Sequence, residues 1–240
     1  MLVFKTNTSI YFLDANVKQS FFCYNIEMTT TLLLIIAYLL GSIPSGLWIG
    51  KVFFHKNLQD YGSGNIGTTN TFRILGTKAG IVVFILDCLK GTLATILPSL
   101  LGIHTISPAL FGLIAVLGHT FSIFNHFKGG KAVATAAGLF LGYSPWFVVI
   151  LGILFLITFY LTSMVSFSSI VCAATAAILI LVLPLFHIIF VSYDWLFIII
   201  VLFIVSFIII RHRENIARIR NKTENIFNFG LNLTHQKHNI

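Results

Sequence analysis

Asp60–Gly76 reads Asp-Tyr-Gly-Ser-Gly-Asn-Ile-Gly-Thr-Thr-Asn-Thr-Phe-Arg-Ile-Leu-Gly and is the longest polar interruption in a hydrophobic chain. Gly62, Gly64 and Gly67 lie within six positions of this stretch. Glycine permits positive φ, so successive backbone N–H groups can converge on an anion. Short polar side chains surround the glycines, and Arg73 supplies a planar fork of donors that suits phosphate. The stretch predicts a phosphate-binding loop, and the alternative is an ordinary Gly- and Asn-rich surface loop between two helices.

The composition outside this loop is that of an integral membrane protein. Of the 240 residues, 57% are hydrophobic and only 9% are charged, whereas soluble domains average about 25% charged residues. Several apolar runs reach the roughly 20 residues needed to cross a bilayer. The formal charge of +8 comes from Lys and Arg residues beside these runs, where they set orientation. We therefore expect the lipid bilayer as a partner and no nucleic acid.

Seven membrane-spanning helices are predicted, giving an all-α fold. The first contains Gly41-Ser42-Ile43-Pro44-Ser45-Gly46, which is expected to kink it, and the fourth is short and rich in Ala and Gly. The second contains Asp87 and Lys90, which share a helix face and can pair, either for function or as a structural ion pair. The predicted spans are about Thr30–Gly50, Lys78–Leu97, Pro108–Phe124, Ala132–Tyr143, Trp146–Leu161, Ser168–Phe190 and Trp195–Ile210.

The charges of the loops predict the orientation. Lys and Arg follow the first, third and seventh spans, whereas the loops near 99–107, 144–145 and 191–194 contain neither. The positive-inside rule then places the N-terminus outside and the C-terminus in the cytoplasm. This arrangement requires the short fourth segment to cross the membrane. The loop at 60–76 and the segments around 129–131 and 211–218 then share the cytoplasmic face.

Two further polar clusters have features of anion sites. Gly129, Gly130 and Lys131 precede a predicted helix, where free N–H groups, the helix dipole and an ammonium would attract an anion. His212 and Asn215 are three residues apart and share a face of the basic helical continuation. The alternatives are an interfacial anchor and a juxtamembrane stop signal. Three such clusters on one side of the membrane favour a composite phosphate site.

No metal site or cofactor is expected. Cys23, Cys88 and Cys172 show no metal-binding spacing, and the eight histidines show no HExxH pattern. Residues 1–27 contain no apolar run long enough to span and lack the order of a signal peptide. We expect them to form a dispensable extension, followed by a membrane domain over 28–224 and a polar tail over 225–240.

A set of ordered motifs between Met28 and Glu224 resembles the bacterial acyl-phosphate:glycerol-3-phosphate acyltransferases. The motifs are Ser42–Pro44, Gly62–Arg73, Asp87–Gly91, Gly118–Phe121, Phe127–Thr135 and His212–Ile216. The resemblance implies a seven-span enzyme of phospholipid synthesis in the bacterial plasma membrane, with its active site facing the cytoplasm. It implies transfer of a fatty acyl group from acyl phosphate to glycerol 3-phosphate, which forms lysophosphatidic acid and inorganic phosphate.

The resemblance also implies roles for individual residues. The catalytic set is Ser63, Arg73, Lys131 and His212. The residues that bind substrate or phosphate are Gly62, Gly64, Asn65, Gly67, Thr69, Gly129, Gly130 and Asn215. Ala132 departs from the family, which usually has glycine there.

The mechanism and one competing function follow from the same residues. No Ser-His-Asp order or nucleophile elbow is present, which favours direct attack by the glycerol hydroxyl. His212 is a candidate base, a group that only orients phosphate is the second option, and a substrate phosphate oxygen is a third proton acceptor. The competing function is a membrane transporter of organic phosphates. Against it, the sequence shows no matched broken helices in two inverted halves.

Overall fold

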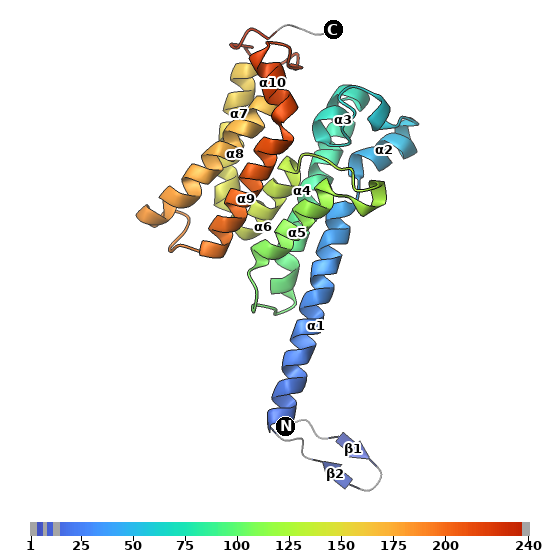
Figure 1. The fold of residues 1–240 in the computed structure, drawn as a ribbon, viewed down its shortest axis with the longest axis vertical. Coiled ribbons are helices and arrows are strands. Elements are labelled where there is room, and N and C mark those ends of the chain that lie inside the picture. The colour runs from blue at the N-terminus through green and yellow to red at the C-terminus, as the bar shows by residue number, and fades with distance from the viewer. Residues whose placement is uncertain (1–3, 7–8, 12–14, 237–240) are drawn as a thin grey trace.

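The computed structural model describes residues 4–6, 9–11 and 15–236. An antiparallel hairpin of β1 (Phe4–Thr6) and β2 (Ser9–Tyr11) precedes a helical bundle (Figure 1). The longer helices are α1 (Ala15–Ser42), α4 (Thr77–Leu100), α5 (Pro108–Thr120), α6 (Val133–Tyr143), α7 (Pro145–Thr162), α8 (Val165–Val182) and α9 (Trp195–Arg211). Shorter elements are α2 (Ser45–Phe54), η1 (Leu58–Asp60), α3 (Thr68–Leu75), η2 (Ile123–Asn125), η3 (Leu183–Phe186) and α10 (Arg213–Arg220). Apart from the hairpin, the predicted helical fold is confirmed.

The helices have the length and surface of membrane spans. By length and composition, four segments of the described chain can cross a membrane, or up to six if each of two bent helix pairs is one span. Large apolar side chains point outward, among them Leu156 at 65% exposure, Ile178 at 61% and Ile199 at 62%. Such a surface is unfavourable in water but matches lipid. This is a helical membrane protein.

The first predicted span is a bent pair of helices, interrupted at the expected kink. α1 ends at Ser42, and α2 begins at Ser45 with a bend of 46°. Pro44 has no N–H to continue the hydrogen-bond ladder, which explains the interruption. Lys90 Nζ donates to the Ile43 carbonyl at 3.0 Å and so satisfies one acceptor at the break. The helix also begins at Ala15, so the boundary expected near Met28 is not a helix boundary.

Inside the bundle, the other predicted intramembrane feature is confirmed. Lys90 Nζ lies 2.8 Å from Asp87 Oδ1, and both side chains are buried. α4 and α6 pack closely at Gly138. A Cβ there would lie only 2.0 Å from the Cys88 carbonyl oxygen, so only glycine fits. This close approach holds the 11-residue α6 in the centre of the bundle. The residues just before α6 are thereby fixed beside α4 and α5.

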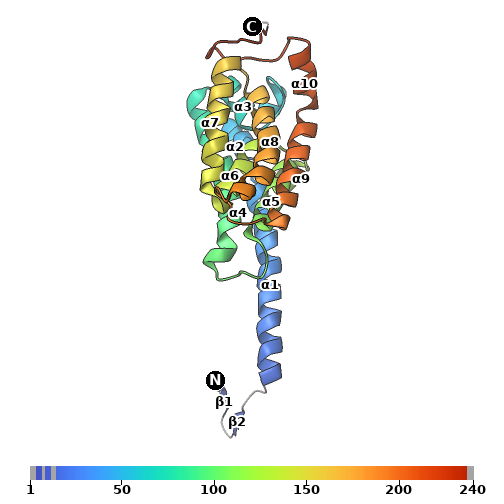
Figure 2. The same ribbon diagram turned by 90° about the vertical axis from the view of Figure 1, so that its left-hand side faces the viewer.

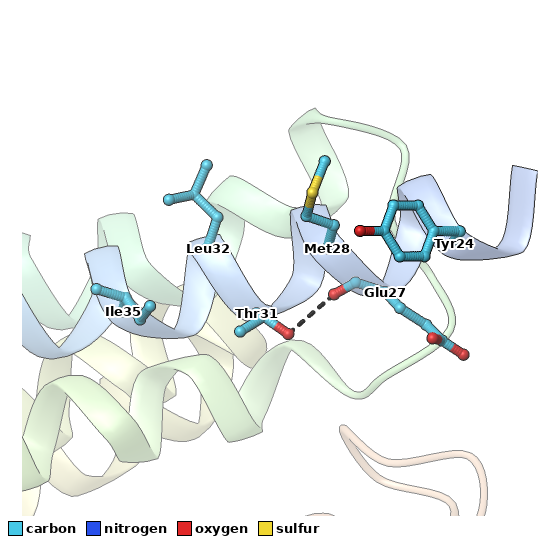
Figure 3. A pocket seen from close by; sticks show the side chains of 6 residues that line it. All are labelled: Tyr24, Glu27, Met28, Thr31, Leu32 and Ile35. Carbon is cyan, nitrogen blue, oxygen red and sulfur yellow. Dashed lines mark hydrogen bonds between the residues drawn. The ribbon is translucent and has the colours of Figure 1, made fainter. Parts of the chain in front are cut away.

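The N-terminal part of α1 projects beyond the bundle in both views (Figures 1 and 2). Figure 3 shows a pocket on its surface, where Thr31 Oγ1 donates to the Glu27 carbonyl at 3.0 Å. The pocket is lined by Tyr24, Glu27, Met28, Thr31, Leu32 and Ile35. Because it contains no residue of the predicted phosphate clusters, it is not the candidate site.

The segment after α10 folds back onto the end of α7. Backbone N–H groups of Phe227, Leu231 and Leu233 donate to the carbonyls of Ser163, Tyr160 and Leu161 at 2.9, 2.8 and 2.9 Å. The expected polar tail, 225–240, is therefore packed against the bundle over its described part, up to Gln236. This docking places residues 224–227 next to α3 and α10, which lie at the same end of the molecule (Figures 1 and 2).

Candidate phosphate site between α3, α6 and α10

Two of the predicted clusters meet at Lys131 and Asn215. Lys131 lies in the loop before α6, and its ammonium donates a hydrogen bond to Asn215 Oδ1 on α10. Asn215 Nδ2 in turn donates to Glu224 Oε1 at 2.9 Å. Arg218 Nε donates to Glu224 Oε2 at 2.9 Å, so both carboxylate oxygens have a partner. Glu224, which the sequence analysis did not assign to the site, is fully buried at the centre of this network.

Arg73 reaches the same network from α3. Its Nη2 donates to the Asn225 carbonyl at 3.3 Å, and its guanidinium lies 5.6 Å from the ring centroid of Phe227. Among the described residues, the buried Nε of Arg73 has no hydrogen-bond partner. Burial lowers the pKa of Arg73, while Glu224 opposes this effect, and the guanidinium stays charged. A buried cationic donor without a partner is costly, and an anion would satisfy it.

The surroundings of Lys131 lower the pKa of its ammonium. Burial lowers the pKa of Lys131 to about 8, and the positive charge of Arg218 acts in the same direction. Glu224 and Glu214 oppose the shift. Near pH 7 the ammonium is therefore protonated and less solvated than a surface lysine. A phosphate placed beside it would stabilise its charged form.

His212 is held in one tautomer. Its Nδ1 lies 2.8 Å from the Ile208 carbonyl oxygen, and its side chain is buried. A carbonyl only accepts hydrogen bonds, so Nδ1 carries the proton and Nε2 keeps its lone pair. Burial lowers the pKa of His212 to about 4, and the positive charges of Lys131 and Arg211 act in the same direction, although the hydrogen bond to Ile208 opposes them.

The first half of the glycine-rich loop folds on itself. Gly62 and Gly64 have φ of +61° and +68°, as expected for glycine in a tight turn. The Ser63 N–H donates to Asn70 Oδ1 at 3.1 Å, and the Gly64 N–H donates to the Tyr61 carbonyl at 3.0 Å. The expected set of free N–H groups is therefore wrong at these two positions. The buried Asn70 organises the turn, whereas sequence reasoning had counted it only among the short polar side chains of the loop.

The second half of the loop leads into α3. The Gly67 N–H donates to Asn65 Oδ1 at 3.2 Å, so it is also engaged, and Asn65 has a local role. Thr69 lies in the first turn of α3 and is half-buried, whereas Ser63 is exposed. Among the described residues, no hydrogen bond joins the side chains of Ser63 or Thr69 to Lys131 or Asn215. α3 nevertheless connects this loop to the network, because it also contains Arg73.

Gly129 and Gly130 position Lys131 by close packing. A Cβ at Gly129 would lie 2.0 Å from the His119 carbonyl oxygen, which leaves no room for a side chain. The Gly130 N–H donates to that same oxygen at 3.2 Å, so it is not free to bind phosphate as expected. Both glycine carbonyls accept from Arg211 Nη2 at 3.3 Å. The turn is thereby tied to the end of α9.

Ala132, between Lys131 and α6, has a backbone conformation that favours glycine. Its φ is +65°, and its side chain is almost completely buried. A left-handed conformation costs a residue with a Cβ about 1–2 kcal/mol. The departure at this position therefore introduces local strain directly beside the site lysine.

The structure therefore joins Arg73, Lys131 and Asn215 through Glu224 and Asn225, with His212 one turn before Asn215 on the same side. Sequence reasoning missed Glu224, Arg211 and Arg218 as parts of the site. One signal was available for Glu224, since it is an isolated acidic residue after a run of basic ones. The contact of Arg211 with the glycine carbonyls left no signal in the sequence.

Comparisons with known proteins identify the family of the chain. A family model described as glycerol-3-phosphate acyltransferase matches residues 31–222. Glycerol-3-phosphate acyltransferases of Streptococcus gordonii strain Challis and Streptococcus pneumoniae strain CGSP14 are 61% and 60% identical over 209 residues, covering 87% of this chain and 98% of theirs.

Solved structures give the same result. The chain resembles crystal structures of PlsY, an integral membrane glycerol 3-phosphate acyltransferase, in its glycerol 3-phosphate and lysophosphatidic acid forms. The TM-scores are 0.75 and 0.72 at 38% identity, over 83% of this chain and 96% and 95% of theirs. The chain therefore belongs to the glycerol-3-phosphate acyltransferase family.

Proposed function

We propose that this acyltransferase moves a fatty acyl group from acyl phosphate to glycerol 3-phosphate, forming 1-acyl-glycerol 3-phosphate and inorganic phosphate. The single observation that carries the proposal is the contact of Lys131 with Asn215, because it joins two separate motifs at one partly buried cation. Arg73 adds a second cation to the same network through Asn225. Both substrates contain phosphate, and the two cations offset the repulsion between them.

Reaction by direct attack fits these residues. The glycerol hydroxyl oxygen forms a bond with the acyl carbonyl carbon, and the bond from that carbon to the phosphate oxygen breaks. Phosphate leaves with the electron pair of that bond. Lys131 and Arg73 stabilise the negative charge that develops on the leaving phosphate. Ser63, Thr69 and the surrounding glycine turns, Gly62–Gly67 and Gly129–Gly130, shape the site and hold the substrates in reacting geometry.

The proton of the attacking hydroxyl passes to an oxygen of the departing phosphate. His212 is poorly suited to take a full positive charge, because burial lowers its pKa and the positive charges of Lys131 and Arg211 act in the same direction. Its Nε2 lone pair instead accepts a hydrogen bond from the hydroxyl and orients it. Asn215 accepts a hydrogen bond from the Lys131 ammonium and so holds it near the attacking hydroxyl.

For the membrane arrangement, we propose seven spans in the bacterial plasma membrane. By length and composition, the described chain has up to six spans when each bent helix pair counts as one. The shorter helix α6 would be the seventh. The N-terminus then lies outside, and the phosphate site faces the cytoplasm, where glycerol 3-phosphate is soluble. The acyl chain of the donor extends between helices into the lipid.

The experiment that tests this function uses purified protein, labelled glycerol 3-phosphate and three donors of equal chain length. Acyl phosphate should give labelled lysophosphatidic acid, and acyl-CoA and acyl carrier protein thioesters should not. The basic site suits a leaving group that is itself an anion. The sequence contains one HxxxxD spacing, from His55 to Asp60, but both side chains are exposed and neither belongs to the network of Lys131 and Asn215. Comparable turnover with a thioester would refute the proposed donor. Label that crosses vesicles without forming lipid would instead indicate the transporter.

A further inference from the structure

Glu224 lies outside the family match, which ends at residue 222, yet it is the most buried carboxylate of the site. Its Oε1 accepts from Asn215 and its Oε2 accepts from Arg218, each at 2.9 Å. Its backbone N–H donates to Gln236 Oε1 at 3.1 Å. A buried carboxylate is costly unless it is fully paired, and here every one of these groups has a partner.

The orientation of the Asn215 amide depends on this carboxylate. An ionised carboxylate only accepts hydrogen bonds, so the amide NH₂ of Asn215 must face Glu224. The amide oxygen then faces the opposite way, toward the ammonium of Lys131. The ammonium only donates, so it also selects the amide oxygen, but Glu224 is the group that holds the NH₂ end of the amide. Without Glu224 the amide is held from one side only, and the direction of the ammonium is less restrained.

The charge of Glu224 has a second effect on the same lysine. The charged groups that act on Lys131 come from three elements and are Arg211 at the end of α9, Glu214 and Arg218 on α10, and Glu224 in the segment after it. Glu224 pairs directly with Arg218, whereas Glu214 is exposed on α10. Arg218 is the cation that lowers the pKa of Lys131 most, and Glu224 offsets this effect by pairing with it.

We propose that Glu224 is a positioning residue of the phosphate site, acting through Asn215 and Arg218 to hold the Lys131 ammonium toward the substrate. The inference rests on the function proposed above. The following residues fasten Glu224 in place, because Asn225 contacts Arg73 and the Phe227 ring packs against Phe72 and Phe159. The segment from Glu224 to Gln236 thus belongs to the site and is not a free tail.

The test compares Glu224→Gln and Glu224→Ala with the control Glu214→Gln, which removes an exposed carboxylate from α10. Glu224→Gln keeps an acceptor for Asn215 but loses the charge, and Glu224→Ala loses both. We expect kcat/KM for glycerol 3-phosphate to fall about tenfold in Glu224→Gln and up to about a hundredfold in Glu224→Ala. Glu214→Gln should stay within about threefold of the wild type, as for a solvated charge.

Two readouts separate positioning from a merely structural role. In Glu224→Gln the alkaline limb of kcat/KM should move to lower pH by more than in Glu214→Gln, because Arg218 is left unpaired beside Lys131. In the background of Asn215→Ala, Glu224→Ala should cost clearly less than in the wild type, because the route through the amide is already absent and only the effect through Arg218 remains. Losses that track only the yield of folded protein, with an unmoved limb, would overturn the proposal. The proposal would also be overturned if the loss in the double variant equalled the product of the losses in Asn215→Ala and Glu224→Ala.

Binding of inorganic phosphate keeps the test independent of turnover. If the wild type makes no lysophosphatidic acid, the proposed function fails, and the inference is then judged by phosphate-dependent thermal stabilisation alone. Phosphate should stabilise the wild type and Glu214→Gln at lower concentrations than Glu224→Gln. Equal concentration dependence in all three proteins would contradict the positioning role.

Discussion

The ammonium of Lys131 donates a hydrogen bond directly to the amide oxygen of Asn215, although 84 positions separate these residues in the chain. Close packing of the glycine turn before Lys131 fixes one partner, and the buried carboxylate of Glu224 fixes the other. The contact therefore depends on three segments that meet only in the folded bundle.

Acyl transfer should lose efficiency at alkaline pH. The pKa of Lys131 lies near 8 in the free protein, so its positive charge is present below this pH and is lost above it. Since kcat/KM reports the free enzyme, kcat/KM for glycerol 3-phosphate should decline above about pH 8. Lys131→Arg stays charged, so its remaining kcat/KM should not decline above about pH 8. An identical limb in Lys131→Arg would assign the titration to another group.

The turn before Lys131 should not tolerate a methyl group. In Gly129→Ala the new Cβ would meet the backbone oxygen of His119 at 2.0 Å, and backbone cannot move aside as a side chain can. We expect a loss of at least about a hundredfold in acyl transfer, the usual effect of misplacing a group in an active site. Gly152→Ala is the matched control, because a Cβ there meets nothing within 4 Å. Near-wild-type turnover in Gly129→Ala would show that the turn is not a constraint.

Much of this fold could be predicted from the sequence, because apolar run length and loop charge are local properties. The Asp87–Lys90 pair, three residues apart on one helix, was predictable for the same reason. The break after Ser42 was underestimated, since Pro44 indicates a kink but does not say how far the next helix turns away. The phosphate clusters were recognisable by residue type and order.

Other parts of the site could not be predicted, because they depend on contacts between distant segments. The N–H groups of Ser63 and Gly64 looked free in sequence, but the fold gives them to Asn70 and Tyr61. The role of Glu224 required knowing that the last segment returns to α7. Nothing in its composition distinguishes that segment from an unpacked polar tail.

The N-terminal extension should be dispensable. Packing of α1 against α5 begins near Leu33, which is 4% exposed and lies with Phe111 in one core cluster, whereas Tyr24 and Met28 are 63% and 55% exposed. A protein that begins at Met28 should insert and keep its rate of acyl transfer. Its amount in the membrane and its rate per molecule should be measured together. A truncated protein that accumulates normally but is inactive would contradict this expectation.

Cysteine labelling can test the orientation. With Cys23, Cys88 and Cys172 replaced, single cysteines near Lys56, Lys128 and Arg220 should be protected in intact cells. Cysteines at Thr105 and Ser192, in the loops before α5 and α9, should be labelled from outside. If position 220 were labelled from outside while position 128 was protected, α6 would not cross and the seven-span arrangement would fail.

The central claim is that Lys131 belongs to a composite phosphate site and is not merely an interfacial anchor. Its matched control is Lys128, three positions away, which contributes the same charge to topology but is exposed. The most direct measurement is acyl transfer from acyl phosphate by purified Lys131→Ala and Lys128→Ala at equal amounts of inserted protein. Lys131→Ala should lose about 10²–10³-fold in rate, together with Arg73→Ala and Asn215→Ala, as when a donor to transition-state charge is removed. Lys128→Ala should stay within about threefold of the wild type, as for a solvated surface charge. Equal and modest losses at Lys131 and Lys128 would contradict the composite site.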